Sequence, residues 1–380
     1  MSARSLRHDT SPDRGDRSGA FLRRHPDPVS QWRVAHAWLL EKRRQTVPRE
    51  QMRPAPRRPR SRGKAFGMAR YTVTGGAGFI GSHLVDALLA QGHDVVVLDD
   101  FSTGKAGNLP SAAHVIRGDT ADLRTVTEVL VGSEGCFHLA AIASVQRGNE
   151  EWAVSHRVNQ GGTVAVLDAA RIAGGMPVVY ASSAAIYGDT GGAVAAEDRA
   201  PAPLTAYGAD KLGSELHAAI GWRVHRLPSF GCRFFNVYGP RQDPSSPYSG
   251  VISIFARRAS AGQELVIHGD GEQVRDFIHV SDIVAHLLAA MRLLQREPAA
   301  HVANICTGQG TSILDLAQLI ADLARLPIPI RHVPARTGDI RHSIGLAVRA
   351  AASLGIEAQI ALAEGLENTW SSLTGPHSPR

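Results

Sequence analysis

The chain has only three cysteines among its 380 residues, and it contains no run of about eighteen apolar residues, the length that a membrane-spanning helix needs. A transmembrane helix is therefore not expected. Cys136, Cys232 and Cys306 are far apart and each lies in an apolar run, so they predict buried thiols in the cytoplasm rather than a disulfide framework. The 17 histidines form no H-x-x-x-H pair and the cysteines no C-x-x-C pair, so no metal site is expected.

The body of the chain also lacks an excess of basic residues. Residues 1–67 contain 17 Lys and Arg but 6 Asp and Glu, a balance of +11. The whole chain has 41 Lys and Arg and 35 Asp and Glu. Residues 68–380 therefore have 24 basic and 29 acidic residues, a balance of −5. Nucleic-acid binding requires a basic surface, so we expect no nucleic-acid partner for the body.

The first 67 residues predict a disordered basic extension. Arg53–Lys64 is rich in Arg and Pro, and only Val34–Lys42 has a helical pattern. Such a composition buries too little apolar surface to offset the entropy of ordering. The segment lacks the apolar stretch of a secretory signal, and its six acidic residues argue against a transit peptide. A nucleic-acid-binding tail stays open, as does translation from Met68, which directly precedes the first expected strand.

Ala69–Gly92 predicts a strand, a glycine turn and an amphipathic helix. Gly75, Gly78 and Gly81 have the spacing G-x-x-G-x-x-G. The first permits a tight turn, the second lets backbone N–H groups approach a pyrophosphate, and the third lets the helix pack closely on the strand. This pattern indicates a dinucleotide-binding fold.

A second expected strand, His93–Asp100, ends in two aspartates, and the first of them, Asp99, lies 18 residues after Gly81. Asp99 is the first candidate to accept from the adenosine ribose hydroxyls, and Asp100 is the second. A carboxylate there repels a 2′-phosphate, so NAD is favoured over NADP.

Further strands are expected at the apolar runs that alternate with helical segments: His114–Asp122, with its strand ending at Asp119, Gly135–Ala143, and Val178–Asp189. Strands that alternate with helices predict a doubly wound parallel sheet, which binds ligands at the carboxyl ends of its strands. One of these ends carries the serine pair Ser182–Ser183, which is polar where an apolar residue would be easier to bury.

Tyr207 and Lys211 lie four residues apart at the start of an expected helix, so they share one helical face. An ammonium next to a phenol favours loss of the phenol proton. The pair is consistent with a tyrosine that acts as a base, but taken alone it is better explained by an amphipathic helix with a surface lysine.

With these residues in this order, the chain resembles extended short-chain dehydrogenases/reductases and, more narrowly, NAD-dependent UDP-sugar 4-epimerases that act on UDP-glucose or UDP-N-acetylglucosamine. The resemblance covers residues 70 to about 345. Its most specific stretches are A-S-S-A-A-I-Y-G-D, L-T-A-Y-G-A-D-K, Arg233–Phe255, His268–Asp282 and R-T-G-D-I-R-H-S.

The resemblance implies an α/β fold, a Rossmann doubly wound parallel sheet with a smaller C-terminal substrate-binding domain. It implies an NAD-binding domain over residues 68–240 and a mainly substrate-binding domain over 241–375, with about 277–298 packing back on the first domain. Relatives pair the helices near Val158–Ile172 and Tyr207–Ile220, so a homodimer is expected.

Each site residue carried over by the resemblance has an implied role. The catalytic residues are Ser183, Tyr207 and Lys211. The NAD-binding residues are Gly75, Gly78, Phe79, Ile80, Gly81, Asp99, Asp100, Asp119, Thr120, Ala140, Ala141, Asn159, Tyr207, Lys211 and Phe234. The residues implied to bind a UDP-sugar are Ser183, Tyr207, Asn236, Val251, Arg275, Arg336, Asp339 and Ser343.

In the reaction that the resemblance implies, Tyr207 takes the proton from the sugar 4-OH, Lys211 depresses the tyrosine pKa, and hydride passes from C4 to NAD and back to the other face. Relatives that dehydrate or decarboxylate carry an acid just after the strand serine, where this chain has Ala184 and Ala185. The small side chain of Ser343 suggests that an N-acetyl group fits at C2. A UDP-glucuronate 4-epimerase and an inactive NAD-binding regulator stay open.

Overall fold

A seven-stranded, entirely parallel sheet forms the larger part of the structure. The computed structural model describes residues 68–244, 250–335 and 340–375. The strands lie in the order β10-β6-β5-β4-β1-β2-β3. Their bounds are β1 Arg70–Thr74, β2 Asp94–Asp99, β3 His114–Arg117, β4 Gly135–His138, β5 Val178–Ser183, β6 Ser229–Phe234 and β10 Ala300–Ile305. The direction of strand addition reverses between β1 and β4, which is where such sheets bind ligands.

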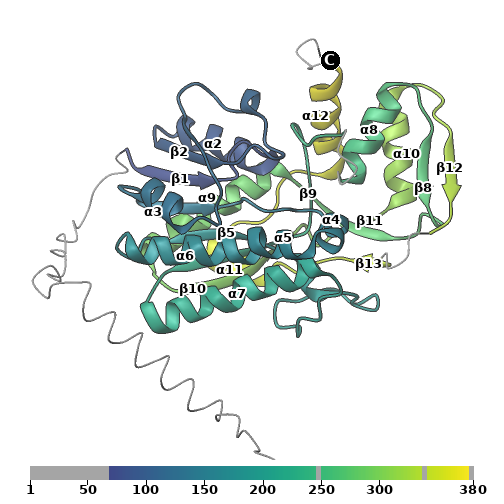
Figure 1. Cartoon of the computed structure of the whole chain (residues 1–380). Coiled ribbons are helices and arrows are strands. Elements are labelled where there is room, and N and C mark those ends of the chain that lie inside the picture. Colours follow the sequence, from purple (N-terminus) through teal and green to yellow (C-terminus); the bar gives the residue numbers. More distant parts are fainter. Residues whose placement is uncertain (1–67, 245–249, 336–339, 376–380) are drawn as a thin grey trace, which may run out of the picture. The chain divides into compact units, whose positions relative to one another are not determined.

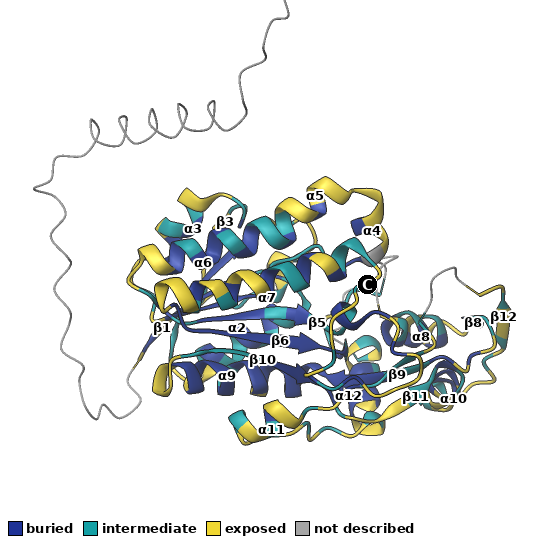
Figure 2. Cartoon of the chain, turned by 90° about the horizontal axis from the view of Figure 1, so that it is seen from below, coloured by how far each residue is buried: buried dark blue, intermediate teal, exposed yellow. Residues whose placement is uncertain are grey.

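Helices cover both faces of this sheet (Figures 1 and 2). Buried residues alternate along β2: Val95 and Val97 pack with one face's helices, while Val96 and Leu98 pack with the other's. One face is covered by α2 (Phe79–Ala90), α9 (Val280–Arg296) and α11 (Val348–Leu354), and the other by α3 (Leu123–Leu130), α6 (Gly162–Ile172) and α7 (Ala206–His225). Between β4 and α6 lie α4 (Val145–Glu150), α5 (Trp152–His156) and a π-helical turn, Arg157–Gly161. Burial on both faces explains why the strands are almost continuously apolar.

A smaller C-terminal part has its own sheets and core. In it β9 (Val274–His279) pairs with β7 (Asn236–Tyr238), β11 (Gly310–Ser312) and β13 (His342–Ser343), and β8 (Leu265–His268) pairs with β12 (Ile330–Val333). The helices α8 (Val251–Ser260), α10 (Ile313–Ala324) and α12 (Leu362–Thr374) pack around a separate apolar cluster that includes Phe255, Leu316 and Leu366. The expected fold, a Rossmann sheet with a smaller C-terminal part, is confirmed.

Some expected element ends are wrong by several residues. The strand expected to end at Asp119 ends at Arg117, and β4 ends at His138 rather than Ala143. The run Val178–Asp189 is a strand only as far as Ser183, whose hydroxyl accepts from Ala185 N and begins a short helical turn. The domain boundary near residue 240 stays a prediction, and the extension over 1–67 lies outside the described residues.

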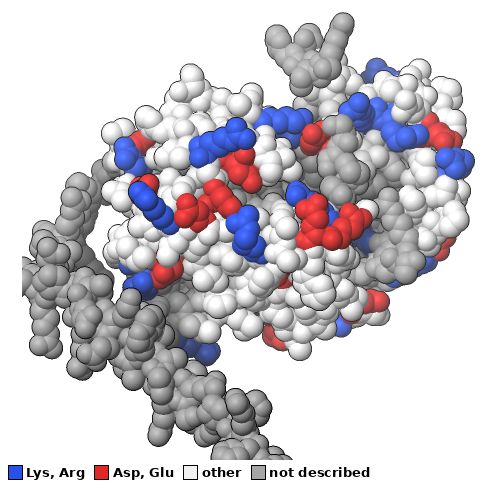
Figure 3. All heavy atoms as spheres, viewed as in Figure 1, with Lys and Arg blue, Asp and Glu red and all other residues white. Residues whose placement is uncertain are grey.

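The cysteines and the surface match the composition. Cys136, Cys232 and Cys306 are buried free thiols, and burial raises the pKa of Cys136 to about 12. None of the helices in the described part of the chain is long and apolar enough to cross a bilayer. On the face seen in Figure 3, basic and acidic side chains are interspersed, so this face offers no continuous basic surface.

The glycine turn between β1 and α2 leaves no room for side chains at two of its positions. Gly75 has φ +70°, and a Cβ there would lie 2.6 Å from the Ala140 backbone N. A Cβ on Gly81 would lie 2.1 Å from the Gly75 carbonyl O, far inside contact distance. The close approach of α2 to the strand end therefore depends on glycine at both positions.

We predict that Gly81→Ala destabilises the protein by about 1–3 kcal/mol, because the methyl group forces the turn apart. Gly107→Ala is the matched control, because a Cβ on Gly107 meets no atom within 4 Å. Thermal melting of both variants should show a loss of about 2 °C or more for Gly81→Ala alone. Equal melting temperatures for the two variants would contradict this account of the turn.

Candidate active site

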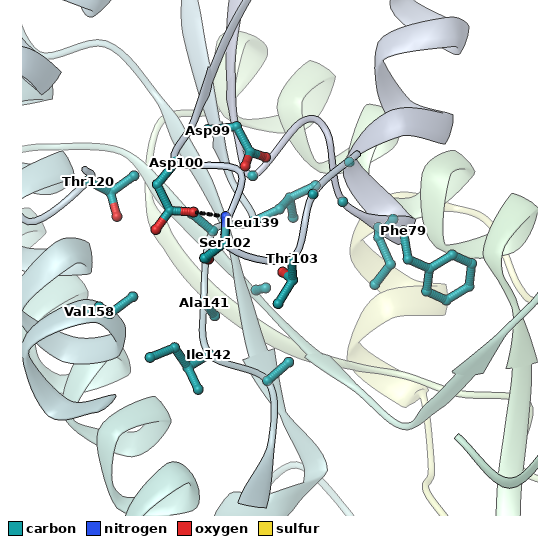
Figure 4. Close-up of a pocket in the computed structure, with 18 of the residues that line it drawn as sticks. Phe79, Asp99, Asp100, Ser102, Thr103, Thr120, Leu139, Ala141, Ile142 and Val158 are labelled. Carbon is teal, nitrogen blue, oxygen red and sulfur yellow. Dashed lines mark hydrogen bonds between the residues drawn. The ribbon is translucent and has the colours of Figure 1, made fainter. Parts of the chain in front are cut away.

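A cavity of about 570 Å³, here called the main cavity, opens at the carboxyl ends of the parallel strands. The glycine turn after β1, the end of β2, the loop after β4 and the end of β5 all contribute to its wall (Figure 4). Of the residues expected to bind NAD, those that line it are Gly75, Gly78, Phe79, Ile80, Gly81, Asp99, Asp100, Asp119, Thr120, Ala140, Ala141, Tyr207, Lys211 and Phe234. The topology thus brings together residues that are spread over 160 positions of the chain.

The start of α2 suits a phosphate. Its first residue, Phe79, follows Gly78, and within the described residues neither a side-chain cap nor an acidic residue occupies its first turn. The backbone N–H groups of this turn are therefore available to an anion, and the helix dipole favours negative charge there. These features fit the diphosphate of NAD.

Acidic side chains line the far end of the main cavity. Asp99 is only 6% exposed, and its carboxylate accepts from Ala77 N and Phe101 N, both at 2.9 Å. Burial raises the pKa of Asp99, partly offset by those hydrogen bonds. The neighbouring Asp100 is exposed and accepts from Ser102 N at 2.8 Å, the dashed line in Figure 4. Both carboxylates line the main cavity, and their expected roles at the adenosine ribose stay predictions.

Ser183, Tyr207 and Lys211 meet on the wall of the main cavity. The N-cap Thr205, whose hydroxyl accepts from Gly208 N, starts α7 so that Tyr207 and Lys211 lie one turn apart. The Tyr207 phenol faces the Ser183 hydroxyl, and the interaction between them lowers the tyrosine pKa. The Lys211 ammonium lies 5.6 Å from the Tyr207 ring centroid and donates to the Ala181 carbonyl at 2.8 Å. The three side chains expected to be catalytic therefore form one connected group.

The acid–base properties of this group differ from the expectation that Lys211 depresses the tyrosine pKa. In the protein alone, burial raises the pKa of Tyr207, and the interaction with Ser183 only partly lowers it. Burial also lowers the pKa of Lys211 to about 8, with Asp210 acting in the opposite direction. The charge on Lys211 therefore does not outweigh desolvation of the phenolate. The positive ring of bound NAD would supply the further charge that a phenolate needs.

Asn159 lies behind the wall of the main cavity instead of in it, and its expected role as an NAD-binding residue stays a prediction. It is 1% exposed, accepts from Ile142 N at 2.8 Å and donates to Ile142 O at 3.2 Å. Its amide thus fixes the loop after β4, and that loop lines the main cavity.

Of the residues expected to bind the substrate, Ser183 and Tyr207 line the main cavity, whereas Asn236, Val251, Arg275 and Ser343 do not. Ser343 pairs with Arg275 in the β13–β9 register, and Asn236 donates to the Asp276 carbonyl at 3.1 Å. Val251 is the first residue of α8, directly after Gly250, which lines the cavity. Arg336 and Asp339 lie outside the described residues.

Several cavity residues were not predicted from the sequence. They include Ser102, Thr103 and Gly104 of the loop after β2, Arg147, Arg157, Gln242 and Gly250. Arg157 forms an ion pair with Asp119 at 2.6 Å. The polar S-T-G loop directly after Asp100 was an available signal for the first group, whereas Arg157 and Asp119 are 38 residues apart and meet only in the fold.

Comparison with known proteins agrees with this geometry. The model of the NAD dependent epimerase/dehydratase family matches residues 71–306. The UDP-glucose 4-epimerase of Mycolicibacterium smegmatis is 38% identical over 307 residues, which cover 79% of this chain and 97% of that protein.

Two solved structures are also similar. One is a UDP-glucose 4-epimerase from Thermotoga maritima with UDP-glucose (TM-score 0.77, 36% identity, 80% of this chain and 98% of that one). The other is a UDP-N-acetylglucosamine 4-epimerase from Methanobrevibacter ruminantium in complex with UDP-N-acetylmuramic acid (TM-score 0.77, 31% identity, 81% of this chain and 99% of that one).

Fold and site together define an extended short-chain dehydrogenase/reductase. The chain belongs to the NAD dependent epimerase/dehydratase family. The expectations of NAD as cofactor and of an isomerase are confirmed. Its cytoplasmic location stays a prediction.

We predict that Asp99→Asn weakens NAD binding about tenfold or more and reduces the preference for NAD over NADP. The change removes a charge and one of the two oxygens that accept backbone N–H groups, and a hydrogen bond to a charged group contributes about 1.5–3 kcal/mol. Asp100→Asn is the control and should change the affinity less than about threefold, because its carboxylate is solvated. Calorimetric titration of NAD into nucleotide-free protein measures both. A larger loss for Asp100→Asn would assign the ribose to Asp100.

Proposed function

We propose that the chain is an NAD-dependent 4-epimerase of UDP-hexoses, which interconverts UDP-glucose and UDP-galactose, or their N-acetyl counterparts, through a transient 4-keto sugar. The observation that carries this proposal is the contact of Ser183, Tyr207 and Lys211 at the wall of the main cavity. It is supported by the similar UDP-sugar 4-epimerases and by the share of their length that the chain covers.

In this proposal Tyr207 is the base. Its oxygen takes the proton of the sugar 4-OH, and Ser183 holds the same sugar oxygen and passes the proton. Lys211 keeps a positive charge beside the phenolate, and it would hold the ribose next to the nicotinamide. NAD, when bound, would supply the acceptor for a hydride from C4 and its return. The 4-keto sugar rotates in the site so that its other face is reduced, and Tyr207 then returns the proton to the sugar oxygen. The reaction therefore consumes no net oxidant and releases no proton.

The residues after Ser183 limit what else the site can do. Ala184 and Ala185 begin a short helical turn, and neither side chain can transfer a proton. Dehydration or decarboxylation requires a further acid or base at C5 or C6. Oxidation and reduction at C4 is therefore the chemistry that these side chains support.

The UDP part of the substrate would bind toward the smaller C-terminal part. Arg275 and Arg336 are proposed to neutralise the diphosphate, since the arginine fork binds phosphate bidentately. Asn236 and Val251 are proposed to border the diphosphate and the uracil, and Asp339 to accept from the uridine ribose. Ser343, next to Arg275 in the β13–β9 register, is proposed to leave space for an N-acetyl group at C2.

A UDP-glucuronate 4-epimerase would need a cation near the sugar C6. Arg147 lines the main cavity and carries such a charge, but Glu151 already pairs with it at 3.0 Å. An inactive NAD-binding regulator would not need Tyr207 facing Ser183 or an ammonium buried beside it. Both alternatives remain outcomes of the experiment below.

The purified protein, incubated separately with UDP-glucose, UDP-N-acetylglucosamine and UDP-glucuronate, should convert at least one of the first two into its 4-epimer. NMR of the products identifies the sugar. Conversion of UDP-glucuronate alone would favour the glucuronate enzyme, with Arg147 as its cation. Absence of any product, with NAD still bound, would favour the regulator.

We predict that kcat/KM falls as the pH rises above about 8, because the lowered pKa of Lys211 leaves it charged below that pH and neutral above it. Lys211→Met should be slow at every pH and should lack this alkaline decrease. Rates measured from about pH 6 to about pH 10 test this. An identical alkaline decrease in wild type and variant would exclude Lys211 as its cause.

We also propose a homodimer formed through α7. Leu216, Ile220 and Val224 follow one another at every fourth position of α7 and are 59%, 52% and 65% exposed. Figure 2 shows exposed residues along this helix beside α6. An apolar stripe on one helical face, next to a second helix, suits a four-helix interface with another copy.

We predict that the double variant Leu216→Asp, Ile220→Asp is a monomer, because the charges would be buried unpaired in the interface. Val131→Asp is the control, since Val131 is 66% exposed and directly follows α3, a helix outside the proposed interface. Light scattering at micromolar concentration should give a dimer mass for wild type and control. A monomer mass for wild type would refute the dimer.

A further inference from the structure

One face of α7 is attached to β5 at three successive turns. Tyr207, Lys211 and Glu215 are spaced four residues apart, so they share that face. The Tyr207 phenol faces the Ser183 hydroxyl, and Lys211 donates to the Ala181 carbonyl at 2.8 Å. The third attachment is not part of the proposed reaction: the Ser182 hydroxyl donates to Glu215 Oε1 at 2.5 Å.

Glu215 is held from a second direction by Arg233 of β6. The guanidinium donates from Nε and Nη2 to the two carboxylate oxygens at 2.9 and 2.8 Å, and the side chains are only 8% and 6% exposed. Arg233 Nη1 also donates to the Tyr187 hydroxyl at 2.7 Å, which in turn donates to Asn304 at 2.6 Å. Both oxygens of Glu215 are therefore fixed, by Ser182 of β5, the strand that carries the active-site serine, and by Arg233 of the neighbouring β6.

This pair is a costly way to hold a helix. Burial of two charges costs several kcal/mol per ion, and an apolar pair of the same volume is often as stable or more stable. What a bidentate pair adds is a single geometry, because the planar fork accepts only one orientation of the carboxylate. Three neighbours of this pair line the main cavity: Phe234 next to Arg233 in sequence, Lys211 one turn before Glu215, and Ser182 opposite Arg233 in the β5–β6 register.

We propose that Glu215 and Arg233 are positioning residues for the reaction: they fix the rotation and the axial position of α7 on β5, and so hold Tyr207 and Lys211 at the reacting atoms. This inference rests on the proposed function, since it requires Tyr207 to be the base. A displacement of 1 Å at a reacting group can cost about a hundredfold in rate, so loss of the pair should appear mainly in kcat.

The double variant Glu215→Leu, Arg233→Met separates positioning from stability. Removal of both charges leaves neither one buried alone, so the melting temperature should stay near that of the wild type. We expect kcat for the epimerised UDP-sugar to fall about 10–100-fold, with KM within about threefold and NAD retained. Wild-type kcat in this variant would overturn the proposal. If the variant does not fold, Arg233→Lys keeps the charge without the fork and carries the same expectation.

A mutant cycle tests whether Glu215 acts through Tyr207. In the Tyr207→Phe background, the further change Glu215→Gln should slow product formation less than about threefold, although the same change slows the wild type at least tenfold. Equal losses in both backgrounds would overturn the proposal. Glu264→Gln is the matched control, because Glu264 accepts from Arg331 at 2.8–3.1 Å in a second bidentate pair, which is exposed and joins β8 to β12. It should leave kcat unchanged.

The outcomes for the two proposals differ. Wild-type turnover by the Tyr207→Phe variant would show that Tyr207 is not the base, and it would overturn the proposed function. If Tyr207→Phe is slow but the double variant Glu215→Leu, Arg233→Met keeps wild-type turnover, only the positioning role of the pair is overturned.

Discussion

The docking of α7 on the carboxyl end of β5 is the contact on which the active site depends. The strand is central in a sheet covered on both faces, so its end is held firmly by neighbours that pack as a continuous apolar layer. The helix brings Tyr207 and Lys211 to that end only if its rotation is fixed. Contacts with three consecutive strand residues, at positions 181–183, supply that constraint, and those with Ala181 and Ser182 are hydrogen bonds.

The site combines groups whose burial is unfavourable until the cofactor is present. The Lys211 ammonium is buried with a single carbonyl acceptor among the described residues, and its pKa is lowered to about 8. Burial also raises the pKa of Tyr207. The positive nicotinamide ring and the ribose hydroxyls of NAD would respectively favour the phenolate and give the ammonium further acceptors. This explains in physical terms why such a protein should hold its cofactor tightly throughout the cycle.

The sequence was informative wherever one residue type at one spacing meets one physical requirement. The glycines of the turn, the acid after β2 and the Tyr207–Lys211 pair are of this kind, and all line the main cavity. Contacts between distant segments could not be predicted in this way. Asn159 binds the backbone of Ile142, Arg157 binds Asp119, and Arg233 binds Glu215, and nothing in the local pattern of these residues specifies the partner. The raised pKa of Tyr207 was missed for the same reason, because burial depends on the whole fold.

The most direct test of the central claim is the epimerisation of UDP-glucose, or of UDP-N-acetylglucosamine if that is the substrate, in D₂O. If the hydrogen at C4 leaves as a hydride and returns from the enzyme-bound cofactor, it never exchanges with solvent. NMR and mass spectrometry of the 4-epimer should then show protium at C4 and no gain of mass at carbon. Deuterium at C4 would mean that the carbon is deprotonated by a base in contact with solvent, and it would contradict the roles assigned to Tyr207, Lys211 and NAD.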